Sequence, residues 1–493
     1  MTTEHKSSGG RHWLRWTVRI GLGLIILVCL GVALFWFYLE RSAAEGKKQL
    51  AAAIAETDAL DPRWRWEEIM EDRPPIPDAE NSMRVIGQIV DSLQGDDPLP
   101  VILPDGEHVL DDYPPNRQLD RERLKLIQDI LSKQQHGLEL AITLKDLPRG
   151  RGVINVTPDF ISTLHEHVHD CRPAFTLLEL DAERLIDQRR PRDAVVRIRS
   201  ILNAGAALRD EPLLISQLVR KDGRRAAVLR TERLLGRSEP GDDDLKDLIG
   251  HFRAEQDDML LLCGLRGERA GYHFLFENLE TDRLPLADSL FGRNPNLSHR
   301  FSASIYHPRL YDDHAFMLVA INEAFNIAQL PLSEQPQAWK DWDHRIRAAK
   351  AEAVVEKRKV LSFLLLPAFD MVAVGTLRDH TRLSCVLTGL AAERFRLAHK
   401  RWPKDLQELC PAYLKEVPTD PFDGKPLKLV QRGHGIIIYS VDKDGKDDGG
   451  DVHKKSTDDD LPKDLGIRLW NPDRRWLPPE AKKKETPKED DDS

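Results

Sequence analysis

The sequence predicts a mainly α-helical protein with one transmembrane helix, a body of repeat-like helical hairpins outside the cytoplasm, and a small α+β module near the C-terminus. Three observations predict this class. One uncharged apolar run covers residues 20–39, apolar residues recur at helical spacing through residues 117–382, and two strand-like segments follow residue 426. The composition, 41% hydrophobic and 31% charged, is close to that of globular proteins and excludes a multi-spanning membrane protein and a wholly disordered chain.

The apolar run at residues 20–39 predicts a single membrane anchor. Twenty helical residues without a charged side chain span the ~30 Å hydrocarbon core of a bilayer. Aromatic residues that favour the membrane interface lie near its ends, namely Trp13, Trp16, Trp36 and Tyr38. Four basic residues precede it, opposed by Glu4 alone: Lys6, Arg11, Arg15 and Arg19. The positive-inside rule therefore places residues 1–19 in the cytoplasm and the bulk of the chain on the outer side of the inner membrane.

A cleaved signal peptide is the alternative interpretation of this run. Ser42, Ala43 and Ala44 resemble a cleavage site of small residues. The apolar core of a signal peptide is usually ~7–15 residues long, however. The longer run favours an anchor that stays in the chain.

Residues 40–116 predict a helical and proline-rich stalk. The helical pattern continues outward over residues 47–57, and prolines then interrupt it at positions 62, 74, 75 and 77. Residues 78–81 are typical of a helix start. The apolar stripe of that helix is Met83, Ile86, Ile89 and Val90.

Residues 117–382 predict the helical body. Apolar residues recur at three- and four-residue steps, and short segments rich in Pro, Gly or Asp separate the helices. One helix is expected to end at Leu235, before Pro240, and Asp242 is expected to cap the next. Because no repeat with a period near 34 residues is present, we expect a helical domain that binds or spaces other proteins.

A histidine cluster within the body indicates an alternative function, that of a zinc-dependent hydrolase. His165, Glu166 and His169 match H-E-x-x-H, in which the two histidines share a helix face and the Glu deprotonates a zinc-bound water. Pro173 lies where such a zinc helix should continue, and no third ligand has the usual spacing. We therefore favour solvent-facing histidines on an ordinary helix over a zinc site.

The segment 383–452 predicts an α+β module. A helix ends near His399 and is followed by Trp402-Pro403 and by the run Val417-Pro418-Thr419-Asp420-Pro421-Phe422. A turn at 432–435 joins strand candidates at 427–430 and 436–441. An acidic, glycine-containing loop follows at 442–451. In this order the landmarks resemble the C-terminal domain of the major pseudopilin of type II secretion systems, over about residues 385–452.

The resemblance implies calcium as a cofactor, because the acidic loop of that family binds it. Asp444 matches the Asp of the family's Asp-Gly pair and Asp451 the later acidic ligand, while Asp442 and Asp448 are further candidates. Ca²⁺ prefers six to eight hard oxygen ligands, and glycines allow the chain to wrap tightly around it. A solvated acidic turn is the alternative.

The departures from the pseudopilin pattern point away from a filament subunit. No prepilin-peptidase site precedes the apolar run, and the long helical body separates the anchor from the module. The whole chain resembles single-anchor proteins of the bacterial envelope. We expect a non-catalytic scaffold or interaction protein linked to a secretion or pilus-like system, and a disordered charged tail at 453–493.

Charge and cysteine content narrow the class of partner. The 72 Lys and Arg residues are outnumbered by 81 Asp and Glu residues, so the net charge is −9 and we expect no nucleic-acid partner. The five cysteines include no C-x-x-C pair and are too few for a disulfide scaffold. The sequence leaves the identity of the protein partners and the oligomeric state open.

Overall fold

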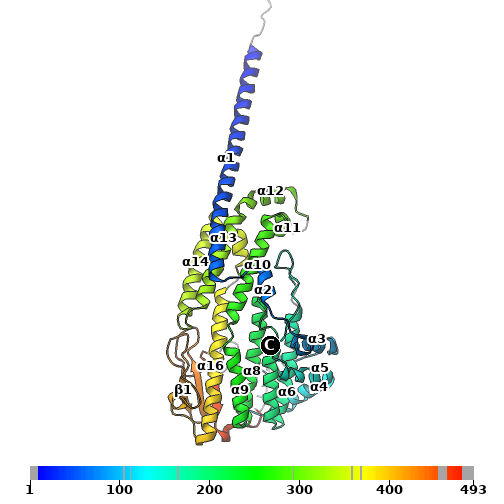
Figure 1. Ribbon diagram of the computed structural model, residues 1–493, viewed down its shortest axis with the longest axis vertical. Helices are drawn as coiled ribbons and strands as arrows, with labels where there is room; N and C mark the ends of the chain where they lie inside the picture. Colours follow the sequence, from blue (N-terminus) through cyan, green and yellow to red (C-terminus); the bar gives the residue numbers. More distant parts are fainter. Residues whose placement is uncertain are drawn as a thin grey trace, which may run out of the picture.

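The computed structural model describes residues 9–103, 106–110, 113–163, 166–292, 294–356, 359–366, 369–452 and 463–479. These residues are mainly helical, with a three-stranded sheet near the C-terminus, which confirms the predicted fold class at that level. Figure 1 shows an elongated bundle of helices, and the first helix projects from one end of it.

The first helix, α1 (Gly9–Leu60), has two parts in opposite environments. Its large apolar side chains are exposed through Tyr38, whereas Leu39, the next residue, is fully buried. From there α1 lies along α13 (Leu310–Ala328), so closely that a Cβ atom on Gly46 would lie 2.9 Å from the backbone nitrogen of Asp312. The helix ends two residues before Pro62, which disfavours helical geometry in the residue before it.

Short helices connect α1 to the body: α2 (Trp66–Asp72), the 3₁₀ turn η1 (Asp78–Glu80) and α3 (Ser82–Ser92). The α3 helix begins where the sequence predicts it, because the Asn81 side chain accepts a hydrogen bond of 3.1 Å from the Met83 backbone N–H. Met83, Ile86 and Ile89 are buried in the main core. This part of the segment 40–116 therefore lies against the body.

The first half of the body is a bundle of helices around the main core. Its elements are α4 (Arg121–Lys133), α5 (Gln135–Thr143), η2 (Leu144–Asp146), α6 (Glu166–Asp187), α7 (Pro191–Ala206), α8 (Leu214–Arg237), α9 (Asp242–Gln256) and α10 (Leu260–Glu280). The helices α6, α7 and α8 pack against one another. Asp242 does not cap α9 as expected. Gly241 is the capping residue, because the Asp244 carboxylate reaches back to its N–H, and Asp242 is the first helical residue.

The second half of the body continues the bundle. Its elements are α11 (Leu286–Phe291), α12 (Leu297–Tyr306), η3 (His307–Arg309), α13, α14 (Gln335–Glu356), α15 (Val360–Leu365) and α16 (Phe369–His399). Trp339 and Trp342 lie near the start of α14 and are buried in a second core cluster. Figure 1 shows α11 and α12 at the end of the body from which α1 projects.

Two stretches are long and apolar enough to cross a membrane: Trp16–Leu60, within α1, and Val360–His399, which contains α15 and α16. In the most apolar part of the first stretch no residue is buried. In the most apolar part of the second stretch 31% of the residues are buried. In the second stretch, α16 packs against α8, α9 and the sheet. The two stretches therefore differ in environment, because α16 contributes to the core of the body.

The C-terminal sheet is antiparallel, with strand order β1 (Lys428–Arg432), β2 (Gly435–Ser440) and β3 (Leu465–Trp470). The short turns η4 (Leu406–Leu409) and η5 (Pro472–Arg474) flank it. The first two strands confirm the predicted hairpin to within one or two residues. The sheet packs on α16, where Gly389 leaves room for Ile467 of β3.

The third strand lies in the segment expected to be a disordered tail, and this expectation is wrong for the described residues 463–479. Leu465, Ile467 and Leu469 are buried, and Trp470 pairs with Gly435. This strand is only six residues long and has many charged residues around it in the sequence, so its alternation of buried and partly exposed residues is difficult to recognise. The other tail residues, 453–462 and 480–493, lie outside the described part of the chain.

Candidate functional site

The acidic loop at 442–451 follows β2 directly. Asp442 is buried, and its carboxylate forms an ion pair with Arg378 of α16 at 2.7 Å. Asp444 is exposed and accepts a hydrogen bond from the Lys446 backbone N–H. Asp448 lies 3.9 Å from the Lys463 ammonium. Each of these predicted calcium ligands thus faces a different neighbour.

The loop is organised by two carboxylates that the sequence did not single out. Asp464 accepts backbone N–H groups from Asp448, Gly450 and Asp451 at 3.4, 2.8 and 3.1 Å. Asp447 accepts the Tyr439 hydroxyl at 2.9 Å. Burial raises the pKa of Asp464, although the backbone N–H groups oppose the shift. Among the described residues, no three His, Cys, Asp or Glu side chains form a metal-ligand group, so the four aspartates are not one ligand set in this arrangement.

The histidine motif is only partly described. His165 lies outside the described residues, Glu166 is the first residue of α6, and His169 is exposed with its Nδ1 3.2 Å from the Arg172 guanidinium. His167, the histidine between the two motif positions, contacts the buried Glu211 at 2.8 Å. Pro173 lies inside α6 without ending it, so this proline does not interrupt the helix that carries Glu166 and His169.

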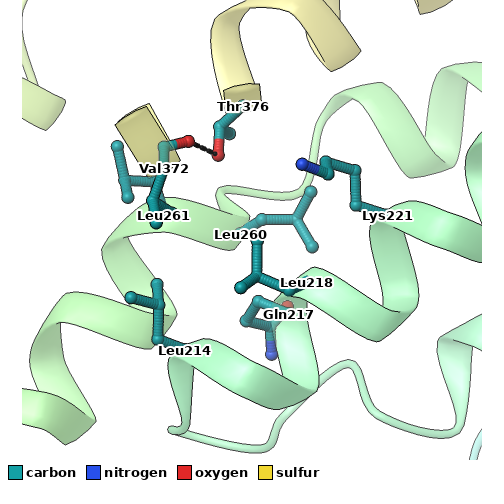
Figure 2. A pocket seen from close by; sticks show the side chains of 8 residues that line it. All are labelled: Leu214, Gln217, Leu218, Lys221, Leu260, Leu261, Val372 and Thr376. Atoms are coloured by element: carbon teal, nitrogen blue, oxygen red, sulfur yellow. Dashed lines mark hydrogen bonds between the residues drawn. The ribbon is translucent and has the colours of Figure 1, made fainter. Parts of the chain in front are cut away.

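Two of the cavities in the described part of the body differ in size and lining. The first, about 10 Å³ in volume, is lined mainly by apolar side chains of α8, α10 and α16 (Figure 2). This volume is about that of a single water site. The second, about 290 Å³, is lined by Met70, Arg73, Ile76, Asn81, Arg151, Gly152, Val153 and Ile154. Its arginines bind protein groups, since Arg73 pairs with Asp210 and Arg151 donates to the carbonyl oxygens of Arg73 and Pro74. Neither lining contains a His, Cys or carboxylate side chain.

Buried arginines on α8 join several helices through acidic partners. Arg230 and Arg237 are fully buried and pair with Glu183 of α6. Burial acts to raise the pKa of Glu183, but the guanidinium groups of Arg237, Arg233 and Arg230 outweigh it and lower the pKa to about 2. Apolar spacing does not reveal such pairs, because α8 carries buried charge around much of its circumference.

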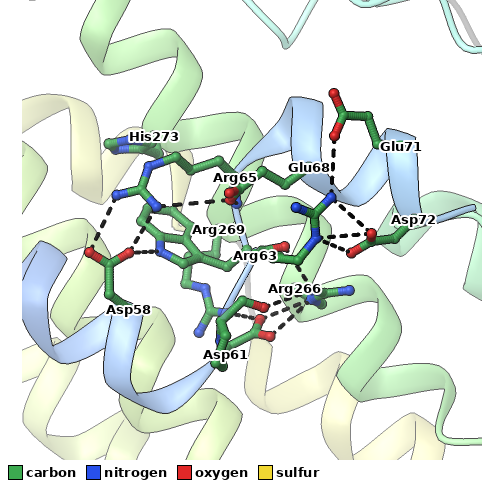
Figure 3. Close-up of polar contacts among 12 residues, drawn as sticks. Asp58, Asp61, Arg63, Arg65, Glu68, Glu71, Asp72, Arg266, Arg269 and His273 are labelled. Carbon is green, nitrogen blue, oxygen red and sulfur yellow. Dashed lines mark hydrogen bonds and ion pairs between the residues drawn. The ribbon is translucent and has the colours of Figure 1, made fainter.

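A polar cluster that involves α1 lies at the C-terminal end of this helix, next to α10 (Figure 3). We call it the anchor junction: Asp58, Asp61, Arg63, Trp64, Arg65, Arg266, Arg269 and His273. Asp58 accepts hydrogen bonds from the Trp64 indole at 2.9 Å and from Arg65 at 2.8 Å. The Arg65 hydrogen bond lowers the pKa of Asp58. Because Asp58 lies in the last turn of α1, these bonds fold the following chain back against the helix.

Arg266 and Arg269 of α10 connect the anchor junction to the core. The Asp61 carboxylate pairs with Arg266 at 2.9 Å and with the fully buried Arg269. Arg269 also donates to Asn322 of α13 at 3.1 Å, and Asn322 donates to Thr57 of α1 at 2.9 Å. Burial lowers the pKa of Arg269 to about 10, and the Asp61 carboxylate opposes the shift. The three helices α1, α10 and α13 are thus joined by one buried network.

Beneath Trp64 lies a buried chain of two histidines and a glutamate. The Trp64 ring is 4.6 Å from that of His273, which hydrogen-bonds His314 at 2.9 Å, and His314 contacts Glu280 at 2.9 Å. Burial lowers the pKa of His273 to about 3, with a further contribution from His314, and lowers that of His314 to about 3. Burial raises the pKa of Glu280 to about 7. Both histidines are therefore neutral at pH 7, and Glu280 is at the midpoint of its titration.

Sequence reasoning missed the anchor junction, although one local signal points to it. Directly after Pro62, Arg63 and Arg65 alternate with Trp64 and Trp66. This pattern places large apolar and charged side chains next to one another just beyond the end of a helix. Comparison of the chain with family models, curated proteins and solved structures finds no match.

Proposed function

We propose that this chain is a single-pass membrane protein of the bacterial envelope, with residues 1–19 in the cytoplasm and the body outside. The observation that carries the proposal is the exposed apolar surface of α1, which ends at Tyr38 and gives way at Leu39 to a buried contact with the body. Exposed apolar side chains around a whole helix are costly in water and favourable in lipid.

The anchor junction gives the membrane helix a mechanical role in this proposal. One continuous helix links the apolar segment to the body, and its far end is fixed by Asp61, Arg269 and Asn322. A body attached in this way keeps a fixed orientation relative to the membrane, unlike one carried on a flexible linker. Such an orientation suits a scaffold that presents a surface to other proteins.

We propose a non-catalytic scaffold role for the body and the sheet. The two cavities are small or lined by residues that already bind protein groups, and the buried charges form pairs between helices. The pseudopilin-like order of landmarks in 383–452 supports a link to a secretion or pilus-like system.

Membrane extraction tests the anchor. The full chain, expressed in a bacterium, should stay in the membrane pellet at alkaline pH, where peripheral proteins dissolve. Replacing Leu27 and Val28 together by Arg should release a large fraction, because each central Arg costs ~2.5–3.5 kcal/mol on insertion. The matched control replaces both by Ile. Release of the unmodified chain would contradict the proposal.

Partner capture tests the scaffold role. The full chain, solubilised in mild detergent and purified by a tag, should bring down a stoichiometric envelope protein. Recovery of pseudopilin-related or secretion components would support the proposed link. A pure chain without any partner, from cells that express the secretion machinery, would contradict it.

Calcium binding remains a proposal for the loop with Asp442, Asp444, Asp448 and Asp451. A bound ion would require these carboxylates to converge, and Asp442 would have to leave Arg378. Millimolar Ca²⁺ should raise the melting temperature of the full chain in detergent, and chelation should reverse the rise. Asp444→Asn should abolish the effect, whereas Asp243→Asn on α9 should preserve it. An unchanged melting temperature would reject calcium.

A further inference from the structure

The helix α12 presents apolar side chains that no part of the described chain covers. Leu297 and Phe301, four residues apart on one helix face, are 85% and 67% exposed. Ala303, on the other face, is buried in the second core cluster, so the helix is held against the body by its opposite side. Phe291 of α11 is also exposed and stacks on His299 of α12 at 4.4 Å.

The sequence of α12 and its flanks contains basic but no acidic residues, although Asp282 pairs with His307 of η3. From Ser289 to Tyr311 the sequence contains no Asp or Glu. The exposed Arg300 lies beside the apolar pair in the sequence, and Arg309 follows in η3. A helix with exposed Leu and Phe side chains, basic neighbours and no acidic residue is typical of helices that lie on anionic lipid surfaces.

The position of α12 matches the expected level of the membrane. Figure 1 shows α11 and α12 at the end of the body from which α1 projects. The η3 turn, which follows α12 directly, contacts α1, and so does the start of α13. The exposed apolar surface of α1 ends at Tyr38, and the buried part begins at Leu39. The helix α12 therefore lies at the end of the body from which the anchor leaves it.

We propose that α12 rests on the anionic bilayer surface and inserts Leu297 and Phe301 among the lipid headgroups and upper acyl chains. This inference rests on the proposed membrane anchor and adds a second contact to it. An anionic bilayer fits better than a protein partner, because α12 lies at the end of the body from which α1 projects and has no acidic residue of its own. Two contacts, α1 and α12, restrict the tilt of the body on the membrane.

Depth-dependent quenching tests this contact in the full chain. Three proteins carry one fluorescent label each: on the native Cys29 of α1, on Phe301→Cys, or on Asp243→Cys at the start of α9. Cys263 and Cys410 are replaced by Ser in all three proteins. Cys29 is also replaced by Ser in the proteins labelled at position 301 or 243. Each is reconstituted into vesicles that contain phosphatidylglycerol and a lipid with a quencher, placed near the headgroup in one set and deep in the acyl chains in a second set. Leu297→Cys provides a second reporter on the same face.

The labels at 301 and 297 should be quenched at least threefold more than the label at 243, and less so in purely zwitterionic vesicles. If Cys29 is quenched but 301 and 297 resemble 243, the anchor stands and the α12 contact is refuted. If the label at 301 is shielded from water yet not quenched by lipid, a protein or a second copy covers the face, and the inference is also refuted. If Cys29 itself escapes a deep acyl-chain quencher, the anchor proposal fails.

Discussion

Individual charged residues decide how firmly α1 is held by the body. Asp61 neutralises Arg269, whose guanidinium is fully buried between α1, α10 and α13. A buried charge that loses its partner is far more costly than an exposed one. The opposite case is Asp72, which pairs with Arg63 in water. The two carboxylates belong to the same region of the chain and allow a direct comparison.

Asp61→Asn should destabilise the protein by roughly 3 kcal/mol, because it leaves the buried Arg269 without a counter-charge. Thermal unfolding of the full chain in detergent, followed by circular dichroism, measures the loss. Asp72→Asn, which breaks a solvent-exposed pair, should leave the melting temperature nearly unchanged. Equal effects of the two substitutions would contradict the proposed role of the anchor junction.

Glu280 should make the stability of the body depend on pH. Its folded-state pKa of about 7 lies above the ordinary value of 4.5, so the folded state binds the proton more tightly than the unfolded chain does. Its contribution is fully present below pH 4.5 and is lost as the pH rises through 7. Glu280→Gln cannot ionise. As the pH rises from 5 to 8, the melting temperature of this variant should therefore increase relative to that of the native chain.

The matched control for this pH series is Glu352→Gln, on the exposed side of α14. Its melting temperature should follow that of the native chain at every pH. A difference between Glu280→Gln and the native chain that stays constant from pH 5 to pH 8 would mean that Glu280 does not titrate in this range.

At the scale of elements, apolar spacing and turn chemistry predict much of the fold. The stripe Met83, Ile86 and Ile89 identified α3, and the Gly433–His434 turn identified the β1–β2 hairpin. These features are local, so the sequence displays them directly. The β3 strand and the helix pairings set by buried arginines depend on distant partners, such as Arg475 with Glu393. No local pattern indicates those contacts.

Two glycines in one turn test the packing of the sheet. Gly435 has φ of +148°, and a Cβ atom there would lie 1.9 Å from the Leu469 carbonyl oxygen of β3. Gly435→Ala should therefore separate β2 from β3 and lower the melting temperature by several degrees. Gly433→Ala, at a position with no atom within 4 Å of the added group, should have little effect. A tolerated alanine at 435 would contradict the described register.

Two glycines of α1 test how this helix is seated. A side chain at Gly46 would collide with the backbone of Asp312, whereas Gly31 has nothing within 4 Å. Gly46→Ile should push α1 away from α13 and increase proteolysis of the body in membranes. Gly31→Ile should leave proteolysis unchanged. Equal protease resistance of both variants would indicate that α1 and α13 are not in close contact.

For the whole molecule, our proposal that the body stands on the membrane in one orientation rests on the exposed apolar part of α1 and on the anchor junction. The sequence predicts the apolar segment and its direction, since both depend on composition and flanking charge. It does not predict the junction, because Asp61, Arg269 and Asn322 are far apart in the chain. The candidate site therefore emerges from the three-dimensional arrangement, whereas the apolar segment proposed to cross the membrane can be recognised in the sequence.

The most direct measurement of the central claim is the accessibility of a cysteine on each side of the membrane. Asp243→Cys, on the exposed first turn of α9, and Ser7→Cys, before the apolar run, are each made in a chain whose Cys263 and Cys410 are Ser. In intact spheroplasts a membrane-impermeant thiol reagent should label position 243 and spare position 7 until the membrane is opened. Labelling of position 7 but not of position 243 would contradict the account.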